Sequence, residues 1–389
     1  MTGIYRLKGQ IKQYGWGGDA FLPALLHIAN PDHRPFAEYW MGIHPQGPAQ
    51  IEFPGGEVRL LSAVEPRMSY LLKVLDVRQM LSIQVHPNRA MAAADYEREN
   101  ALGIPLDSPG RNYKDPNHKP ELMVALSPFW LLHGFQSPEN LKKTFSKYPA
   151  LALLEEKWSA LGYRGLYQWL MELPQEAVDR LLKEPVAGWI TEYQQGRLSK
   201  AEPAFWAARA ALEFSRDGSI DRGIWSIFLF NLVKLETGQG IFQGAGVPHA
   251  YLEGRNVEIM ANSDNVLRGG LTPKHIDVPE LLRHLHTEPI EPDILDPMPN
   301  VAGIREFPVP VNDFSIRMVE LGAGQTFNFP AGSSCLILAP QGALDVCDNE
   351  GCLNVGAPEP CVYVAPNTGV RIRALSPSVL FIASGEQGQ

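Results

Sequence analysis

Alternation of apolar and polar side chains marks the most informative stretch of the chain, residues 81–87. If this stretch is a strand, Ile83 and Val85 point to one face, and Gln84 and His86 point to the other. An amide oxygen and an imidazole then lie about 7 Å apart along the backbone, close enough to share one ion. A proline closes the stretch and should end the strand. The pair alone does not establish a metal site, because a strand histidine beside a polar residue is more often only hydrogen bonded.

Hydrophobic periodicity divides the rest of the chain into β-rich and helical parts. Residues 1–136 and 219–299 alternate in short runs separated by turns, which predicts strands. Residues 137–218 instead carry apolar side chains three and four positions apart and open on a serine–proline pair, so we expect a helical insertion. Residues 300–389 again predict short strands with glycine and proline turns, at the spacing of a sandwich or jelly roll. This last part contains no histidine, so no second metal site of the same kind is expected there.

Length and charge limit the classes of function. The 389 residues allow two or three domains, and the 45% hydrophobic and 20% charged content is typical of a soluble globular protein. A formal net charge of −9 without any basic run argues against nucleic acid or an anionic membrane as the main partner. The N-terminus lacks an apolar signal core, and no stretch of about 18 apolar residues occurs. We therefore expect a cytoplasmic protein without a membrane span, and a monomer.

The four cysteines lie near the C-terminus, at Cys335, Cys347, Cys352 and Cys361. Their spacing is not a repeated CxxC pair. A structural zinc is one interpretation, but free thiols in a reducing compartment fit the spacing better.

Several isolated charged or imidazole side chains are candidates for a site. Lys73 lies inside an apolar run, where it either extends to water or reaches a pocket. Glu121 starts a predicted strand, with Lys119 two residues earlier on the same face, so the two form either a surface ion pair or part of a ligand set. His249 follows a glycine-rich turn and a proline, which fits the rim of a barrel. Arg268 lies in a polar, turn-rich segment and either faces a site or pairs with a nearby aspartate.

Six motifs resemble the type I mannose-6-phosphate isomerase (phosphomannose isomerase) family, and together they are specific over the first 280 residues. They are KQYGWG (12–17), AEYWMG (37–42), LSIQVHP (81–87), NHKPEL (117–122), VPHAYL (247–252) and NSDNVLRGGLTPKHID (262–277). The resemblance implies a mainly β protein with an α-helical insertion, made of two cupin-type jelly-roll domains plus a helical domain. Residues 1–136 and 219–299 would form the catalytic jelly roll, 137–218 the helical insertion, and 300–389 a C-terminal jelly roll without a metal site.

The same motifs imply a single zinc ion per chain. Carried over by motif, its ligands are Gln84, His86, Glu121 and His249. One amide oxygen, two imidazoles and one carboxylate leave a position open for water or substrate, as catalytic zinc sites do. The glutamine stands where cupins usually have a histidine, which weakens any expectation of iron oxygenase chemistry.

The implied reaction interconverts mannose 6-phosphate and fructose 6-phosphate through a cis-enediol. Arg268 is implied to be catalytic, stabilising negative charge as it develops. The proton-transfer base is left open among Lys119, Glu258 and a zinc-bound water or ligand. The substrate, a small sugar phosphate, is expected to contact Ser82, Lys73, Lys274 and Asp264.

Two other classes of function compete with this interpretation. One is a different cupin metalloenzyme, such as an iron-dependent oxygenase or a phosphoglucose-type isomerase. The other is a non-catalytic cupin that only binds sugar phosphates. A complete four-ligand set together with Arg268 argues against the binding module, because binding alone needs no such combination.

Overall fold

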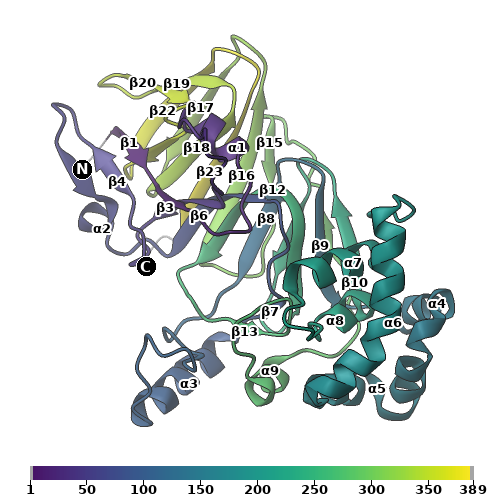
Figure 1. The fold of residues 1–389 in the computed structure, drawn as a ribbon. Helices are drawn as coiled ribbons and strands as arrows, with labels where there is room; N and C mark the ends of the chain where they lie inside the picture. The colour runs from purple at the N-terminus through teal and green to yellow at the C-terminus, as the bar shows by residue number, and fades with distance from the viewer. Residues whose placement is uncertain (1–2, 386–389) are drawn as a thin grey trace.

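The computed structural model describes residues 3–385. Most of its regular structure is β strand, as the alternation predicted, and the helices gather mainly at one end of the molecule (Figure 1). Among the described residues, none of the helices combines the length and the apolar character needed to cross a bilayer.

The C-terminal part of the chain builds two sheets with a common apolar core. The larger sheet has eight strands, in the spatial order β15 (Ile304–Glu306), β16 (Phe314–Leu321), β23 (Ser378–Gly385), β18 (Cys335–Gln341), β21 (Cys361–Val364), β1 (Ile4–Lys8), β4 (Gln50–Glu52) and β5 (Val58–Leu60). The smaller sheet has four strands, β17 (Thr326–Ala331), β22 (Thr368–Ala374), β19 (Ala343–Cys347) and β20 (Cys352–Gly356). Strands from the two ends of the sequence therefore share one sheet.

This sharing differs from the expected domain division. That division assigned all of residues 1–136 to the catalytic part, but β1 pairs with β21 and carries β4 and β5 into the C-terminal sheet. Alternation predicts that these residues form strands, but it carries no information on which distant strand they join. The two β parts are consequently fastened together by hydrogen bonds as well as by packing.

The remaining strands form an 11-stranded sheet around the candidate site. Its main path is β14 (Ile294–Leu295), β11 (Gly240–Gln243), β8 (Glu121–Ala125), β12 (His249–Ala261), β6 (Tyr70–Val77), β3 (Glu38–Gly42) and β2 (Gln10–Lys12). Four strands branch from it, β7 (Gln84–Val85), β9 (Phe129–Phe135), β10 (Phe230–Leu235) and β13 (Leu267–Arg268). The long β12 joins the branches, because its first residues pair with β7 and β9 and its last with β6 and β8.

The helical part begins where the sequence predicted it. Ser137 caps α4 by accepting the Asn140 N–H, and a proline occupies the first turn. The block contains α4 (Pro138–Lys147), η1 (Pro149–Leu151), α5 (Ala152–Glu172), α6 (Gln175–Gln194), α7 (Pro203–Phe214) and α8 (Ile224–Leu229). Outside it lie α1 (Phe21–Leu25), α2 (Leu61–Val64), α3 (Arg89–Ala101) and α9 (Val278–His284). Ile83 and Val85 pack into the core of the helical block, which confirms the predicted apolar face of their strand.

Two of the cysteines form a disulfide, so the expectation of four free thiols was wrong for this pair. Cys347 and Cys352 lie directly opposite each other on β19 and β20 and are bonded. The physical reason is the hairpin, which brings the two side chains to one face and could not be read from the spacing. Cys335 and Cys361 are free and buried, and no cysteine belongs to a potential metal-ligating group of the described residues.

Alternation along β6, β8 and β12 gives these strands two different faces. One face, which includes Leu72, Val74 and Ile259, enters an apolar core shared with the C-terminal sheet. The opposite face carries Lys73 and Glu258, whose charged groups are buried inside the β structure. Charged groups are rarely buried without a partner or a function, so the site is sought on this inner face.

Candidate metal centre

Strand pairing brings three of the predicted residues into one row. The short β7 lies between β12 and β13, with Gln84 opposite both His249 and Arg268. Directly opposite residues of an antiparallel pair present their side chains to the same face. Residues that are 184 positions apart, 84 and 268, are therefore neighbours.

Glu121, the first residue of β8, brings a carboxylate next to this row. Its Oε1 lies 3.5 Å from His86 Nε2, and its Oε2 lies 3.3 Å from His249 Nε2. Lys119 Nζ lies 3.0 Å from Glu121 Oε1. The side chains of His86, Lys119, Glu121 and His249 are buried. Gln84 lines the same small cavity as Glu121 and His249. The structure thus brings all four predicted ligands together.

The orientation of the two imidazoles fits metal binding. His86 Nδ1 donates to the Asn265 carbonyl at 2.8 Å, and His249 Nδ1 donates to the Val247 carbonyl at 3.0 Å. In a neutral ring this leaves a lone pair on Nε2, and both Nε2 atoms are buried without a hydrogen bond to any described residue. A lone pair that faces a carboxylate oxygen is unfavourable unless a cation lies between them.

Electrostatics favour the ligating protonation states. Burial would raise the pKa of the Glu121 carboxyl, but the adjacent Lys119 ammonium holds that pKa well below its usual range. Burial lowers the pKa of His86 to about 4, which outweighs the opposite effect of Glu121. An ionised carboxylate and neutral imidazoles are the forms that bind a metal.

The donor set therefore fits one divalent cation of borderline softness such as zinc. The described residues offer one other group of potential ligands, Asp95, Glu280 and His284. Its atoms already have protein partners, since Arg283 bonds both carboxylates and Tyr113 Oη lies 2.6 Å from His284 Nε2. That group is an ion-pair network between α3 and α9.

A cavity of about 70 Å³ lies beside the metal centre. Its lining is rich in charged groups: Glu38, Lys73, Leu75, Leu81, Gln84, Lys119, Glu121, His249, Tyr251 and Glu258. A hollow of about 500 Å³ lies beside β1 and β4, but none of the predicted site residues lines it. The smaller cavity is therefore the candidate site.

Two predicted residues, Lys73 and Glu258, form a buried pair inside this cavity. Lys73 Nζ lies 2.9 Å from Glu258 Oε1, and Tyr251 Oη donates to Glu258 Oε2 at 2.8 Å. Burial would lower the pKa of the Lys73 ammonium, but Glu258 and Glu38 raise it above its usual value. Lys73 is therefore a charged partner of Glu258, and its predicted contact with substrate stays a prediction.

Arg268 has no ion-pair or hydrogen-bond partner among the described side chains, although it is half-buried. Burial lowers the pKa of its guanidinium, and burial followed by repulsion from Arg268 lowers the pKa of Lys274. Two neighbouring cations without an anion are suited to receive one from solution. The alternative that Arg268 pairs with Asp264 is wrong, because Asp264 accepts from Gln46 at 2.8 Å and lies 3.4 Å from His44 Nε2.

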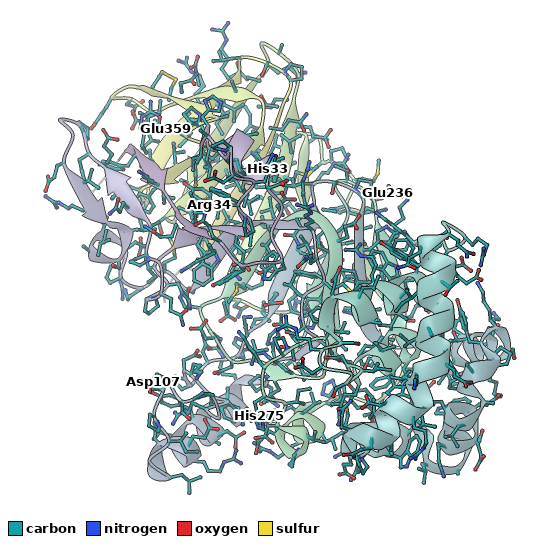
Figure 2. The ribbon with its side chains drawn as sticks, viewed as in Figure 1. His33, Arg34, Asp107, Glu236, His275 and Glu359 are labelled. Atoms are coloured by element: carbon teal, nitrogen blue, oxygen red, sulfur yellow. A yellow bond between two sulfur atoms is a disulfide. The ribbon has the colours of Figure 1, made fainter. Side chains whose placement is uncertain are left out.

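Other candidate residues occupy less decisive places. Ser82 is half-buried and lies two residues before Gln84, just outside the short strand β7. His118 Nε2 lies 3.0 Å from Asp313 Oδ2, so this imidazole is part of the scaffold. His275 is exposed in the segment before α9 (Figure 2).

Sequence reasoning missed three residues that build the site. Tyr251 follows His249 by two positions on one strand, so strict alternation could have placed it in the cavity. Asn265 lies in the turn-rich segment before Arg268; its carbonyl orients His86 and its amide bonds the 115–117 loop. Glu38 faces the cavity from β3 with a pKa raised by burial; it lies in the AEYWMG motif, which gave it no role.

Comparison with known proteins identifies the family of this chain. Residues 4–138 match the family model described as phosphomannose isomerase type I, catalytic domain. The mannose-6-phosphate isomerase of Salmonella typhimurium is 38% identical over 344 residues, which cover 83% of this chain and 85% of that protein. The bovine mannose-6-phosphate isomerase is 31% identical and covers 83% of each chain.

Solved structures agree over nearly the whole length. A crystal structure of the Salmonella typhimurium enzyme with fructose 6-phosphate and zinc has a TM-score of 0.84 and 31% identity, covering 99% of this chain and 100% of that one. The metal-free form of that enzyme has a TM-score of 0.85 and 32% identity over both full chains. This chain therefore belongs to the type I mannose-6-phosphate isomerase (phosphomannose isomerase) family.

Proposed function

We propose that this protein is a zinc-dependent aldose–ketose isomerase that interconverts mannose 6-phosphate and fructose 6-phosphate through a cis-enediol. One observation carries the proposal. Two imidazole nitrogens without a hydrogen bond face Glu121, and Arg268, which also has no partner, lies opposite Gln84 in the same group. The Salmonella typhimurium relative, which was crystallised with zinc and fructose 6-phosphate, supports the choice of metal and substrate.

Gln84, His86, Glu121 and His249 would hold one zinc ion per chain. When bound, zinc supplies a Lewis acid that polarises the sugar oxygens and favours negative charge on them. The protein prepares this site in advance, because Asn265 and the Val247 carbonyl fix both imidazole rings.

Arg268 would stabilise the negative charge that develops on the enediol oxygens. A guanidinium without a protein partner gives its full hydrogen-bonding capacity to the ligand and breaks no ion pair when substrate binds. Lys274 follows Arg268 by six residues, and Ser82 precedes Ile83, which bonds to Gly269 and Gly270. The same region is therefore also the proposed place for the phosphate.

Among the candidate bases, the contacts favour Glu258 over Lys119. Glu258 is a carboxylate with one hydrogen bond to each oxygen, so a lone pair remains to accept the C2 proton and return it to C1. Lys119, 3.0 Å from the Glu121 carboxylate, is an ammonium without a lone pair. Lys119 would instead donate a hydrogen bond to a sugar oxygen.

The fold would serve this chemistry as two cupin-type jelly rolls. The 11-stranded sheet forms the catalytic roll, residues 137–218 buttress it as a helical insertion, and the C-terminal roll carries no metal. The N-terminal strands tie the rolls together. The cytoplasmic location and the monomeric state stay predictions.

A coupled assay tests the proposed reaction. Zinc-loaded protein is incubated with mannose 6-phosphate or with glucose 6-phosphate, and each sugar is followed to its product. We expect fructose 6-phosphate from mannose 6-phosphate, with much slower conversion of glucose 6-phosphate. Binding of mannose 6-phosphate without turnover would contradict the proposal and indicate a binding module, whereas preference for glucose 6-phosphate would indicate a different isomerase.

A further inference from the structure

Three buried polar side chains inside the 11-stranded sheet have atoms without partners. Both carboxamide atoms of Gln243, both of Asn256, and Nδ1 of His133 make no hydrogen bond to any described residue. Gln243 and Asn256 are completely buried, and His133 is 4% exposed. An unsatisfied buried polar group costs about 1–3 kcal/mol, so such groups normally bind an ordered water.

Gln243 lies directly beside a metal ligand. It is the last residue of β11 and pairs across the ladder with Glu121, the first residue of β8. Opposite residues in an antiparallel pair share a face, with Cβ atoms about 4.5–5.5 Å apart. The Gln243 amide therefore adjoins the Glu121 side chain, although no hydrogen bond between them occurs.

His133 lies beside another metal ligand. It pairs with His249 across β9 and β12, so the two imidazoles also share a face. His133 Nε2 donates to the Phe242 carbonyl at 3.3 Å, one residue before Gln243. A neutral imidazole that donates through Nε2 carries a lone pair on Nδ1. The ring therefore reaches β11, with its unused acceptor in the neighbourhood of the unused Gln243 amide.

We propose that Gln243 and His133 together bind one buried water behind the metal ligands, and that this unit positions Glu121 and His249 for zinc. The water donates to His133 Nδ1 and accepts from the Gln243 amide N–H, which gives each of these two atoms a partner. One O–H of the water is left for the ligand side chains. Gln243 and His133 touch neither substrate nor metal, so they are positioning residues.

The inference rests on the proposed zinc site but makes its own prediction about affinity. Partners that orient metal ligands typically change metal affinity 10- to 100-fold when they are removed. Gln243→Leu keeps the volume of the side chain and removes its hydrogen bonds, and His133→Phe does the same for the ring. Because both residues hold the same water, the double variant should lose little more affinity than either single variant.

Asn256→Leu is the matched control. Asn256 is also a buried carboxamide without partners, but its register partner on β8 is Ala125, four residues or about 13 Å along the strand from Glu121. Its replacement should leave the zinc dissociation constant within twofold of the unmodified protein. The comparison separates loss of an orphan amide from loss of ligand positioning.

The experiment measures zinc binding to metal-free protein by competition with a chromophoric chelator, together with the melting temperature of each metal-free variant. We expect a 10- to 100-fold larger dissociation constant for Q243L and for H133F, with melting temperatures of the metal-free forms unchanged or raised. A dissociation constant within twofold of the unmodified protein for folded Q243L, or strictly additive losses in the double variant, would overturn the inference.

A substitute variant and a separate activity measurement complete the experiment. If Q243L does not fold, Gln243→Asn, which withdraws the amide by one methylene, replaces it, and an unchanged dissociation constant in that variant contradicts the inference. Unmodified protein that binds zinc tightly but does not isomerise mannose 6-phosphate would refute the proposed function alone, because the affinity comparison does not depend on turnover.

Discussion

Replacement of Arg268 by alanine should separate catalysis from stability. The guanidinium is half-buried, and no described carboxylate or carbonyl pairs with it. The protein bears the cost of burying this cation without any compensating ion pair. Such an arrangement makes sense when the compensating charge arrives with the substrate.

The two expected effects differ in size and in sign. Removing a donor that stabilises an oxyanion typically lowers kcat about 10²- to 10³-fold, or about 2.7–4 kcal/mol of transition-state stabilisation. The same change leaves no protein group unpaired, so the free energy of unfolding should stay within about 0.5 kcal/mol or increase slightly. Zinc content should not change, because Arg268 is not among the ligands.

The assay combines steady-state kinetics with urea unfolding and metal analysis on the same preparation. Arg283→Ala is the matched control, because Arg283 bonds Glu280 at 2.7 Å and also bonds the buried Asp95. That variant should lose about 1–3 kcal/mol of stability, because Asp95 and Glu280 each lose one charged hydrogen bond and keep only Arg98 as an arginine partner, with kcat nearly unchanged. Normal kcat in R268A, or a loss of kcat explained by lost zinc or lost folding, would refute the reasoning.

Three other results are expected. Lys73→Met should lower the unfolding free energy by about 3–5 kcal/mol in urea titration, because it leaves the Glu258 carboxylate buried without its ammonium partner. The double variant with Glu258→Gln should recover much of that loss. Equal losses in the single and the double variant would contradict the pairing. Chelation of zinc should abolish turnover and lower the melting temperature, with both restored by added zinc, and full activity in verified metal-free protein would contradict the metal centre. Burial and then His249 lower the pKa of His133 to about 4, whereas the pKa in unfolded chains is about 6.5. As the pH falls, the unfolded state therefore takes up the proton first. The free energy of unfolding of the metal-free protein should decrease by up to about 3 kcal/mol between about pH 6.5 and pH 4. H133F should lack that part of the pH dependence of the unfolding free energy in denaturant titrations. An unchanged slope of unfolding free energy against pH in H133F would contradict the assignment to His133.

Local sequence patterns predicted the faces of strands well. The alternation at 83–86 placed Ile83 and Val85 in the apolar core and Gln84 beside the cavity. The serine–proline start of α4 was also correct, because a cap depends only on neighbouring residues. The resemblance supplied the four predicted ligands, and the structure brings these side chains together.

Long-range pairing set the limit of prediction. Lys73 and Glu258 are 185 residues apart, and only the register of β6 with β12 makes them partners. The hairpin that joins Cys347 to Cys352 escaped prediction for a related reason, since a spacing of five residues does not reveal whether two side chains meet. Orphan atoms such as those of Gln243 are visible only after every neighbouring strand is in place.

The claim that two imidazoles and a carboxylate converge on one zinc ion can be measured directly by X-ray absorption at the zinc edge. We predict one zinc per chain, with only nitrogen and oxygen neighbours at about 2.0–2.2 Å and the outer-shell scattering of two imidazole rings. A sulfur neighbour at about 2.3 Å, or a zinc environment without imidazole scattering, would contradict it.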